Sequence, residues 1–239
     1  MIDRLSIRSR PAGWPIMHQT WDKLLFLHWR LPPESLRALI PPRLALDTFE
    51  GSAWIGIIPF TMRGIRPTLL PAVPRLSTSH ELNVRTYVHL VGVPGVWFFS
   101  LDCNNAAAVL GARTFYYLPY YNAEITLEQS NSNISYSLKR TDGPVANFEA
   151  SWNIGAPLPT TEEDSLEFFL TERYCLFSEH KGNLYQSRIH HPSWPLQTAT
   201  LDAHSSTMID VLNLPEPGDA PLLHYAEAIA VDIWMLQKQ

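Results

Sequence analysis

The sequence predicts a protein of the α+β class, built mainly from antiparallel β-strands with a few short helices. It contains twenty prolines against eleven glycines, together with eight tryptophans and nine tyrosines. Prolines favour rigid turns, and aromatic side chains favour strands over a helical bundle. No repeat, low-complexity tract or linker interrupts the 239 residues, so we expect residues 1–239 to form a single domain.

The N-terminal half shows one helix, one loop and two strands. Residues 32–40 begin with proline and an acid and stop at a proline pair, which predicts a short helix. Residues 53–58 and 96–101 are apolar at nearly every position, which suits strands that are buried on both faces, although periodicity alone does not distinguish such strands from a buried helix. Between them, a proline-rich loop from Arg66 to Pro74 carries two adjacent leucines, which suit a lid or a contact with a neighbouring subunit.

The C-terminal half adds one clear strand and one clear helix. Residues 133–139 alternate apolar and polar side chains, as a strand with one solvated face does. Residues 164–174 carry apolar side chains at helical spacing with acids in the first turn, which predicts a second helix. Residues 193–196 are expected to begin a short third helical piece.

Composition and charge exclude several function classes. The net charge of −5 gives no basic surface for nucleic acid. No apolar run approaches the roughly 18 residues of a membrane helix, and the N-terminus has no apolar core of a secretory signal, so we expect a cytoplasmic protein with no membrane partner. Cys103 and Cys175 stand alone, adjacent His190 and His191 are poorly placed to share an ion, and no glycine-rich phosphate loop occurs. We therefore expect no metal and no cofactor.

One predicted strand carries a row of polar side chains. Alternation places Glu81, Asn83, Arg85 and Tyr87 on the same face. Such a row is either the wall of a pocket or a solvated strand face. Inside a closed sheet, these charges would have to pair with each other or meet a ligand. A pairing of the glutamate with the arginine across Asn83 is one expectation.

Three segments resemble the acetoacetate decarboxylase family. In residues 111–121, a glycine–arginine pair precedes a proline and two tyrosines, where that family has two adjacent lysines. Residues 29–44 resemble the segment in which an active-site arginine precedes a short helix, and Arg30 takes that place. Residues 79–88 resemble the strand of an active-site glutamate, and Glu81 takes that place. The resemblance implies a pocket, whereas Tyr120 and Tyr121 in place of the lysines argue against the family's Schiff-base reaction.

A resemblance to the uncharacterised YqjF-like family of the same superfamily covers nearly the whole chain. The resemblance rests on five sequence segments taken together, at residues 49–54, 81–88, 118–120, 172–174 and 191–196. This resemblance implies an acetoacetate decarboxylase-like closed barrel or cone of strands that encloses a pocket. The superfamily's habit of forming homo-oligomers makes such an assembly a reasonable expectation here.

Three hypotheses about function follow from these residues. In the first, the pocket binds a small organic acid or keto compound, with Arg30, Arg85 and Arg113 as candidates for gripping a carboxylate. In the second, a non-Schiff-base isomerase, hydratase or lyase uses Glu81 as general base and Tyr120 or Tyr121 as acid. Neighbours on a strand point to opposite faces, so at most one of the two tyrosines enters the pocket. In the third, the fold serves assembly, and the proline-rich loop and exposed aromatic residues form an oligomer surface. The alternative for Arg30 and Arg113 is a structural role, with each arginine tied to Glu81 or to carbonyl groups.

Overall fold

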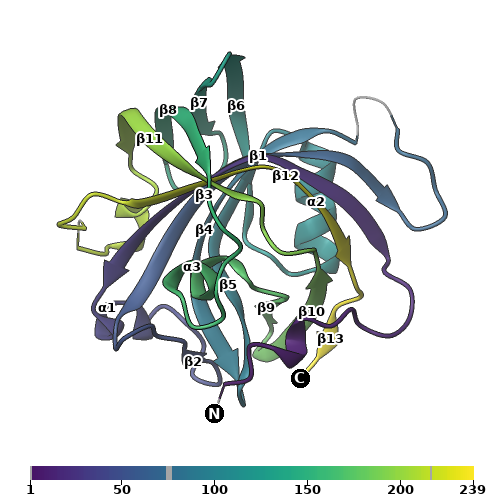
Figure 1. Ribbon diagram of the computed structural model, residues 1–239. Helices are drawn as coiled ribbons and strands as arrows, with labels where there is room; N and C mark the ends of the chain where they lie inside the picture. The colour runs from purple at the N-terminus through teal and green to yellow at the C-terminus, as the bar shows by residue number, and fades with distance from the viewer. Residues whose placement is uncertain (1, 74–76, 216) are drawn as a thin grey trace.

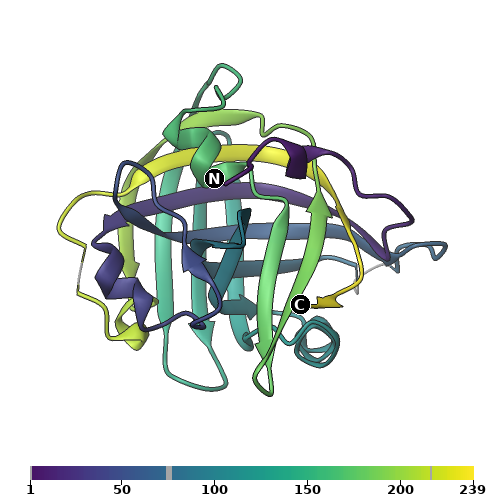
Figure 2. The same ribbon diagram turned by 90° about the horizontal axis from the view of Figure 1, so that it is seen from below.

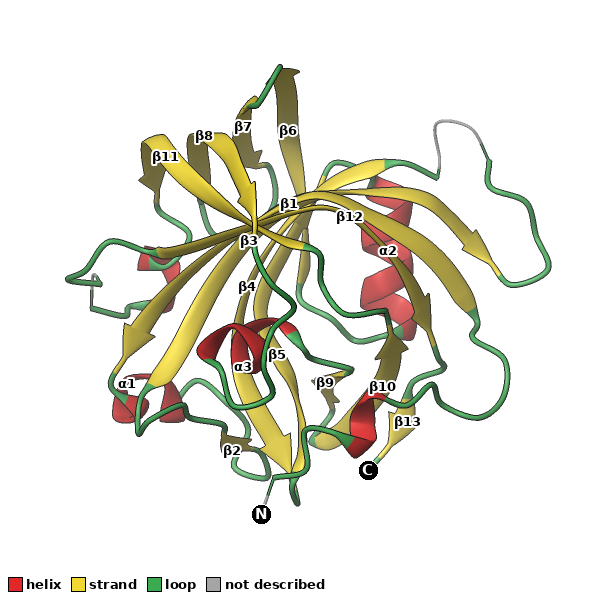
Figure 3. Cartoon of the chain, in the orientation of Figure 1, coloured by secondary structure: helices red, strands yellow, loops and turns green. Residues whose placement is uncertain are grey.

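A single curved sheet of thirteen strands dominates the computed structural model, which describes residues 2–73, 77–215 and 217–239 (Figure 1). The strands are β1 (Met17–Leu31), β2 (Ala45–Leu46), β3 (Ala53–Pro67), β4 (Ser79–Leu90), β5 (Val93–Cys103), β6 (Tyr120–Ser130), β7 (Asn133–Arg140), β8 (Asn147–Pro157), β9 (Cys175–His180), β10 (Asn183–His190), β11 (Leu196–Ser206), β12 (Leu222–Ile233) and β13 (Gln237–Lys238). The helices are α1 (Pro33–Arg37), α2 (Ala106–Phe115) and α3 (Leu166–Thr171), with 3-10 turns at Ser6–Arg8 and Asp210–Leu212. Figure 3 shows how little of the described chain is helical.

The sheet closes on itself in two rings that share the strands β12, β1, β3, β4 and β5. The first half of β5 pairs with β9 and its end pairs with β6, so the two rings part at this strand. They meet again at β12, which pairs with β11 near its start and with β10 at its end. The larger ring is completed by β6, β7, β8 and β11, and the smaller ring by β9 and β10. In Figure 2, the shared strands β1 and β12 run side by side across the molecule.

Each ring encloses its own hydrophobic core. On β1, Leu24 and Phe26 belong to the core of the smaller ring, whereas Leu25 and Leu27 belong to the core of the larger ring. Side chains alternate along a strand, so a wall shared by two interiors must be apolar on both faces. This arrangement explains why residues 53–58 of β3 lack alternation, and why all of them are buried.

Most of the elements expected from the sequence are present. The helices in residues 32–40 and 164–174 are confirmed in shorter form as α1 and α3, and the expected strands lie within β3, β5 and β7. The prediction that residues 193–196 begin a helix is wrong, because this stretch is a loop that enters β11. Its Trp194 is held by hydrogen bonds from its backbone and ring nitrogens to the Glu172 carboxylate and the Thr171 carbonyl, which replace those of a helix.

Two further stretches lie between the strands, one after α2 and one after β3. Tyr116 and Tyr117 follow α2, where Tyr116 caps the helix and Tyr117 has a positive φ of 54°. In the proline-rich loop, Leu69 is 93% exposed and Leu70 is 58% exposed. Pro74, at the end of that predicted loop, lies outside the described residues.

Candidate ligand-binding site

A cavity of about 280 Å³ lies inside the smaller ring, with α2 as one of its walls. Most of the side chains around this inner cavity are apolar and come from strands on both sides of the ring. The apolar and small lining residues are Met17, Trp21, Phe60, Met62, Ile65, Phe98, Leu101, Ala108, Gly111, Ala112, Phe115, Tyr116, Leu118, Leu176, Ile189 and Ile233. Such a lining, with few polar groups, is typical of a small-molecule site.

The polar lining of the inner cavity is concentrated on β4. Glu81, Asn83 and Arg85 alternate along this strand and face the cavity, while Leu82 and Val84 between them face the core of the larger ring. Each of the three polar residues is less than a tenth exposed. The polar row predicted on this strand is therefore buried, and its solvated alternative is excluded.

Glu81 and Tyr120 form a hydrogen-bonded pair at the cavity wall. The Tyr120 hydroxyl donates to Glu81 Oε2 over 2.7 Å. Burial raises the pKa of Glu81 to about 8, against the opposing effect of the Tyr120 hydrogen bond and with a further rise from the nearby Asp102 charge. Burial and the same glutamate also raise the pKa of Tyr120 well above its ordinary value. At neutral pH both side chains are therefore protonated. The Tyr120 proton forms the hydrogen bond between them, and the Glu81 proton is available for a hydrogen bond to another group.

Arg85 brings a positive charge to the same wall without a carboxylate partner among the described residues. No described ion pair includes it, and its Nε is buried without a hydrogen-bond partner. The guanidinium lies 5.8 Å from the ring centres of both Phe26 and Tyr87. Aromatic faces attract a cation, but they do not supply the planar pair of acceptor oxygens that a guanidinium matches best.

The expected ion pair between Glu81 and Arg85 is not formed in the described structure. Four residues along a strand span about 13 Å at roughly 3.3 Å per residue, so the two charged ends are held apart. The glutamate meets Tyr120 and the arginine meets aromatic rings instead. The space between them, beside Asn83, is part of the cavity.

Only Tyr120 of the adjacent tyrosine pair lines the inner cavity within the described chain. Tyr121 points to the other face of β6 and stacks under the Arg140 guanidinium at 4.0 Å. It also packs over Gly143, whose φ is +77° and where an added Cβ would lie 2.5 Å from the Tyr121 ring. Tyr120 lines the cavity and Tyr121 does not, in agreement with the expectation that at most one of the two would enter the pocket.

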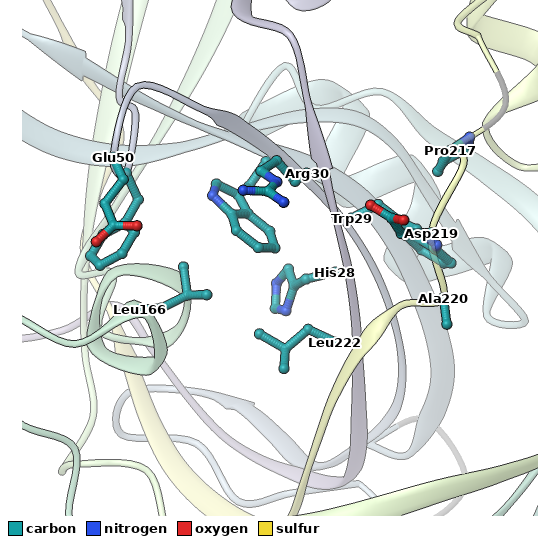
Figure 4. A pocket seen from close by; sticks show the side chains of 11 residues that line it. His28, Trp29, Arg30, Glu50, Leu166, Pro217, Asp219, Ala220 and Leu222 are labelled. Atoms are coloured by element: carbon teal, nitrogen blue, oxygen red, sulfur yellow. The ribbon is translucent and has the colours of Figure 1, made fainter.

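Arg113 and Arg30 are not brought to the inner cavity. Arg113, in the last turn of α2, donates from Nε to the Tyr120 carbonyl at 2.7 Å and from Nη2 to Asp142 at 2.9 Å, so its charge is already engaged at the surface. Arg30 is exposed near the end of β1, where it lines a separate hollow together with His28 (Figure 4). Trp54 lines the same hollow. Alternation places Arg30 on the face of β1 that points into the smaller ring, but Arg30 lies too far along the strand to reach the inner cavity.

The sequence analysis did not identify helix α2 as part of the lining, and it placed Asn83 in the polar row without giving it a role of its own. Helix α2 begins at a clear signal, because the side chain of Asn105 accepts hydrogen bonds from the backbone N–H groups of Ala107 and Ala108. An asparagine before an alanine-rich run could have revealed this helix. Asn83 was seen only as a spacer, although its Oδ1 is buried without a hydrogen-bond partner.

The described residues offer neither a lysine at the inner cavity nor a cluster of metal ligands. None of the residues that line the cavity is a lysine. Within residues 2–73, 77–215 and 217–239, no group of three histidine, cysteine, aspartate or glutamate side chains could hold a metal ion. No helix in those same ranges is long and apolar enough to cross a membrane.

The closed sheet defines an acetoacetate decarboxylase-like fold. The structure superimposes on an acetoacetate decarboxylase from Legionella pneumophila with a TM-score of 0.64 and 15% identity, over 96% of this chain and 88% of that one. It also matches MppR, an enduracididine biosynthesis enzyme complexed with pyruvate, with a TM-score of 0.66 and 12% identity, over 96% of this chain and 92% of that one. At these identities the likeness shows the fold alone.

Residues 18–230 match the model of the DUF2071 family of uncharacterized conserved proteins, and the chain belongs to this family. The uncharacterized protein YqjF of Bacillus subtilis is 44% identical over 231 residues, which span 96% of this chain and 95% of that protein. The family resemblance inferred from the five sequence segments is confirmed.

Proposed function

We propose that the protein binds a small organic acid or keto compound in the inner cavity, with its charged head at Arg85 and its apolar body along α2. The observation that carries this proposal is the buried guanidinium of Arg85, which faces an apolar cavity without a carboxylate partner among the described residues. A buried charge without its partner is destabilising. A ligand carboxylate would supply both the opposite charge and the two acceptor oxygens.

The size of the inner cavity supports a ligand larger than acetate. An apolar cavity of roughly 150 Å³ accommodates one benzene molecule. The inner cavity holds about 280 Å³, close to twice that volume. A head group at Arg85 and the Glu81–Tyr120 pair would leave room for a ring or a short acyl chain. MppR, which shares the fold, is complexed with the keto acid pyruvate, and this head-group chemistry suits the polar wall here.

Replacing Arg85 with methionine tests the binding proposal. We expect Arg85→Met to raise the melting temperature of the ligand-free protein, because the variant no longer buries an unpaired charge. We also expect it to abolish the thermal shift that wild-type protein shows with acids such as hexanoate or phenylpyruvate. Differential scanning fluorimetry with and without these acids measures both effects.

Arg43→Met is the matched control for this experiment, because Arg43 is exposed and makes one hydrogen bond, to the Gln239 carbonyl. It should leave both the melting temperature and the ligand response unchanged. A ligand response retained in Arg85→Met would contradict the proposal, as would the absence of any response of wild-type protein to the acid series.

The Glu81–Tyr120 pair favours a second candidate function, an enzyme that moves a proton without a Schiff base. A glutamate whose burial raises its pKa to about 8 is poised to exchange a proton near neutral pH. When the Tyr120 hydroxyl turns from Glu81 to donate to a substrate carbonyl, the carboxylate form of Glu81 would be free to remove a proton from the adjacent carbon. Isomerases, hydratases and lyases share this step.

Exchange of carbon-bound hydrogen for deuterium tests the second candidate. We expect the protein to accelerate exchange at the carbon next to the carbonyl of 2-oxobutanoate or phenylpyruvate in D₂O, followed by proton NMR. The rate should increase with pH up to about 8 as Glu81 loses its proton, and Glu81→Gln should abolish the acceleration. Exchange that persists in Glu81→Gln would contradict the assignment, and exposed Glu124→Gln on β6 provides the control.

A further inference from the structure

A second recess, separate from the inner cavity, lies near the ends of β1 and β3. This outer hollow has a volume of about 320 Å³ and shares no lining residue with the inner cavity. Figure 4 shows His28 and Arg30 reaching into it from β1, with Leu166 and Leu222 on its apolar side. Its polar floor is formed by the His28 and Trp54 rings, both of which are at least nine-tenths buried.

The hydrogen bond between His28 and Tyr87 determines which ring nitrogen of His28 carries a proton. His28 Nε2 lies 2.6 Å from the Tyr87 hydroxyl. That phenol faces the guanidinium groups of Arg85 and Arg173, which can only donate, so its own proton is directed to Nε2. Burial lowers the pKa of His28 well below its ordinary value, so the ring is neutral and its remaining proton lies on Nδ1. Nδ1 is therefore a donor.

Three of the residues that line the outer hollow carry donors without partners among the described residues. His28 Nδ1 and Trp54 Nε1 are both buried and unpaired. Arg30 belongs to none of the described ion pairs, although Glu50 and Asp219 also line the hollow. A buried donor without a hydrogen-bond partner is destabilising. An anion could accept hydrogen bonds from the His28 and Trp54 donors and pair with the Arg30 guanidinium.

We propose that the outer hollow is a second ligand site, in which His28, Trp54 and Arg30 bind the carboxylate of a small monocarboxylic acid. The two acids at the rim make a dianion unfavourable, because one of its charges would lie close to Glu50 or Asp219. Leu166 and Leu222 provide the contact for a short apolar substituent. The site lies apart from the inner cavity and adds to the proposed function.

The indole N–H signal of Trp54 reports directly on this site. Among the eight tryptophans, its resonance is identified by its loss in Trp54→Phe. Titration of wild-type protein with lactate at pH 7 should shift this signal saturably in proton–nitrogen NMR spectra. Succinate, a dianion, should bind at least several-fold more weakly. Arg30→Met should weaken lactate binding about tenfold or more, as expected for loss of a charged hydrogen-bond donor.

Two further variants separate the outer hollow from the inner cavity. Ala112→Leu, which narrows the inner cavity from α2, should leave the lactate titration of Trp54 unchanged, and exposed Arg43→Met should also leave it unchanged. The proposal is overturned if the Trp54 signal shows no saturable shift, if Arg30→Met binds as tightly as wild-type protein, or if the shift disappears in Ala112→Leu. Failure of acid binding at Arg85 would leave this result intact, so the two proposals fail separately.

Discussion

Replacing Glu81 with glutamine is expected to remove a pH dependence of a few kcal/mol from the free energy of unfolding. Burial raises the pKa of Glu81 from its ordinary value of 4.5 to about 8 in the folded protein. Between these values the folded state holds a proton that the unfolded state has lost. The free energy of unfolding therefore falls as pH rises through this window, by at most about 1.4 kcal/mol for each step of one in pH.

Urea denaturation at intervals from pH 5 to pH 9 measures this effect. The difference in unfolding free energy between Glu81→Gln and wild-type protein should shift in favour of the variant as pH rises, and level off above pH 8. Glutamine remains neutral, so the variant does not have to bury a charge at high pH. Glu124→Gln, on the exposed side of β6, should follow the wild-type curve. Parallel curves for all three proteins would mean that Glu81 titrates as an ordinary exposed acid.

The same burial explains how Glu81 could serve either proposed function. A protonated Glu81 beside Tyr120 can donate to a ligand oxygen, which suits binding of a keto acid. The carboxylate form, which appears near pH 8, can accept a proton, which suits catalysis. A pH profile of acid binding and one of deuterium exchange should therefore change in opposite directions around that pH.

The alternation of side chains along single strands predicted the polar wall, but it did not predict how far along the ring each residue would lie. Glu81 and Arg85 could be assigned to one face because side chains on a strand repeat every two residues. Arg30 also lies on the face of β1 that points into the smaller ring, yet it lines the outer hollow. Position along the strand axis depends on which distant strands close the ring, and β9 and β10 do so through pairings that no local pattern encodes.

Long-range partners also decided the roles of Arg113 and Tyr121, two of the three predicted site residues that the structure places away from the inner cavity. Arg113 is fixed by Asp142, which lies 29 residues further along the chain. Tyr121 is fixed by Arg140 from the neighbouring strand. A guanidinium in a sequence matches a ligand carboxylate and a protein carboxylate equally well, so only the fold distinguishes the two. Arg85, by contrast, has no such partner among the described ion pairs, and this difference makes it the stronger candidate.

Replacing Arg140 with methionine is expected to destabilise the protein by about 3–5 kcal/mol, because it leaves the carboxylate of Asp102 buried without its partner. Arg140 Nε and Nη2 donate to the two oxygens of Asp102 at 2.5 and 2.8 Å, and both side chains are almost completely buried. Burial already raises the pKa of Asp102, and Arg140 opposes that rise. Without the arginine the pKa should rise further, so the loss should be larger at pH 8 than at pH 5.

Arg113→Met is the matched control for Arg140→Met, since both guanidinium groups contact the Tyr121 ring but the Arg113–Asp142 pair is exposed. We expect it to cost about 0–1 kcal/mol. Adding Asp102→Leu to Arg140→Met should recover much of the lost stability, because the uncompensated charge is then gone. Chemical denaturation of wild-type protein, Arg140→Met, Arg113→Met and the double variant at pH 5 and pH 8 measures these differences in stability. Equal losses for Arg140→Met and Arg113→Met would show that the buried pair stabilises the fold no more than the exposed one.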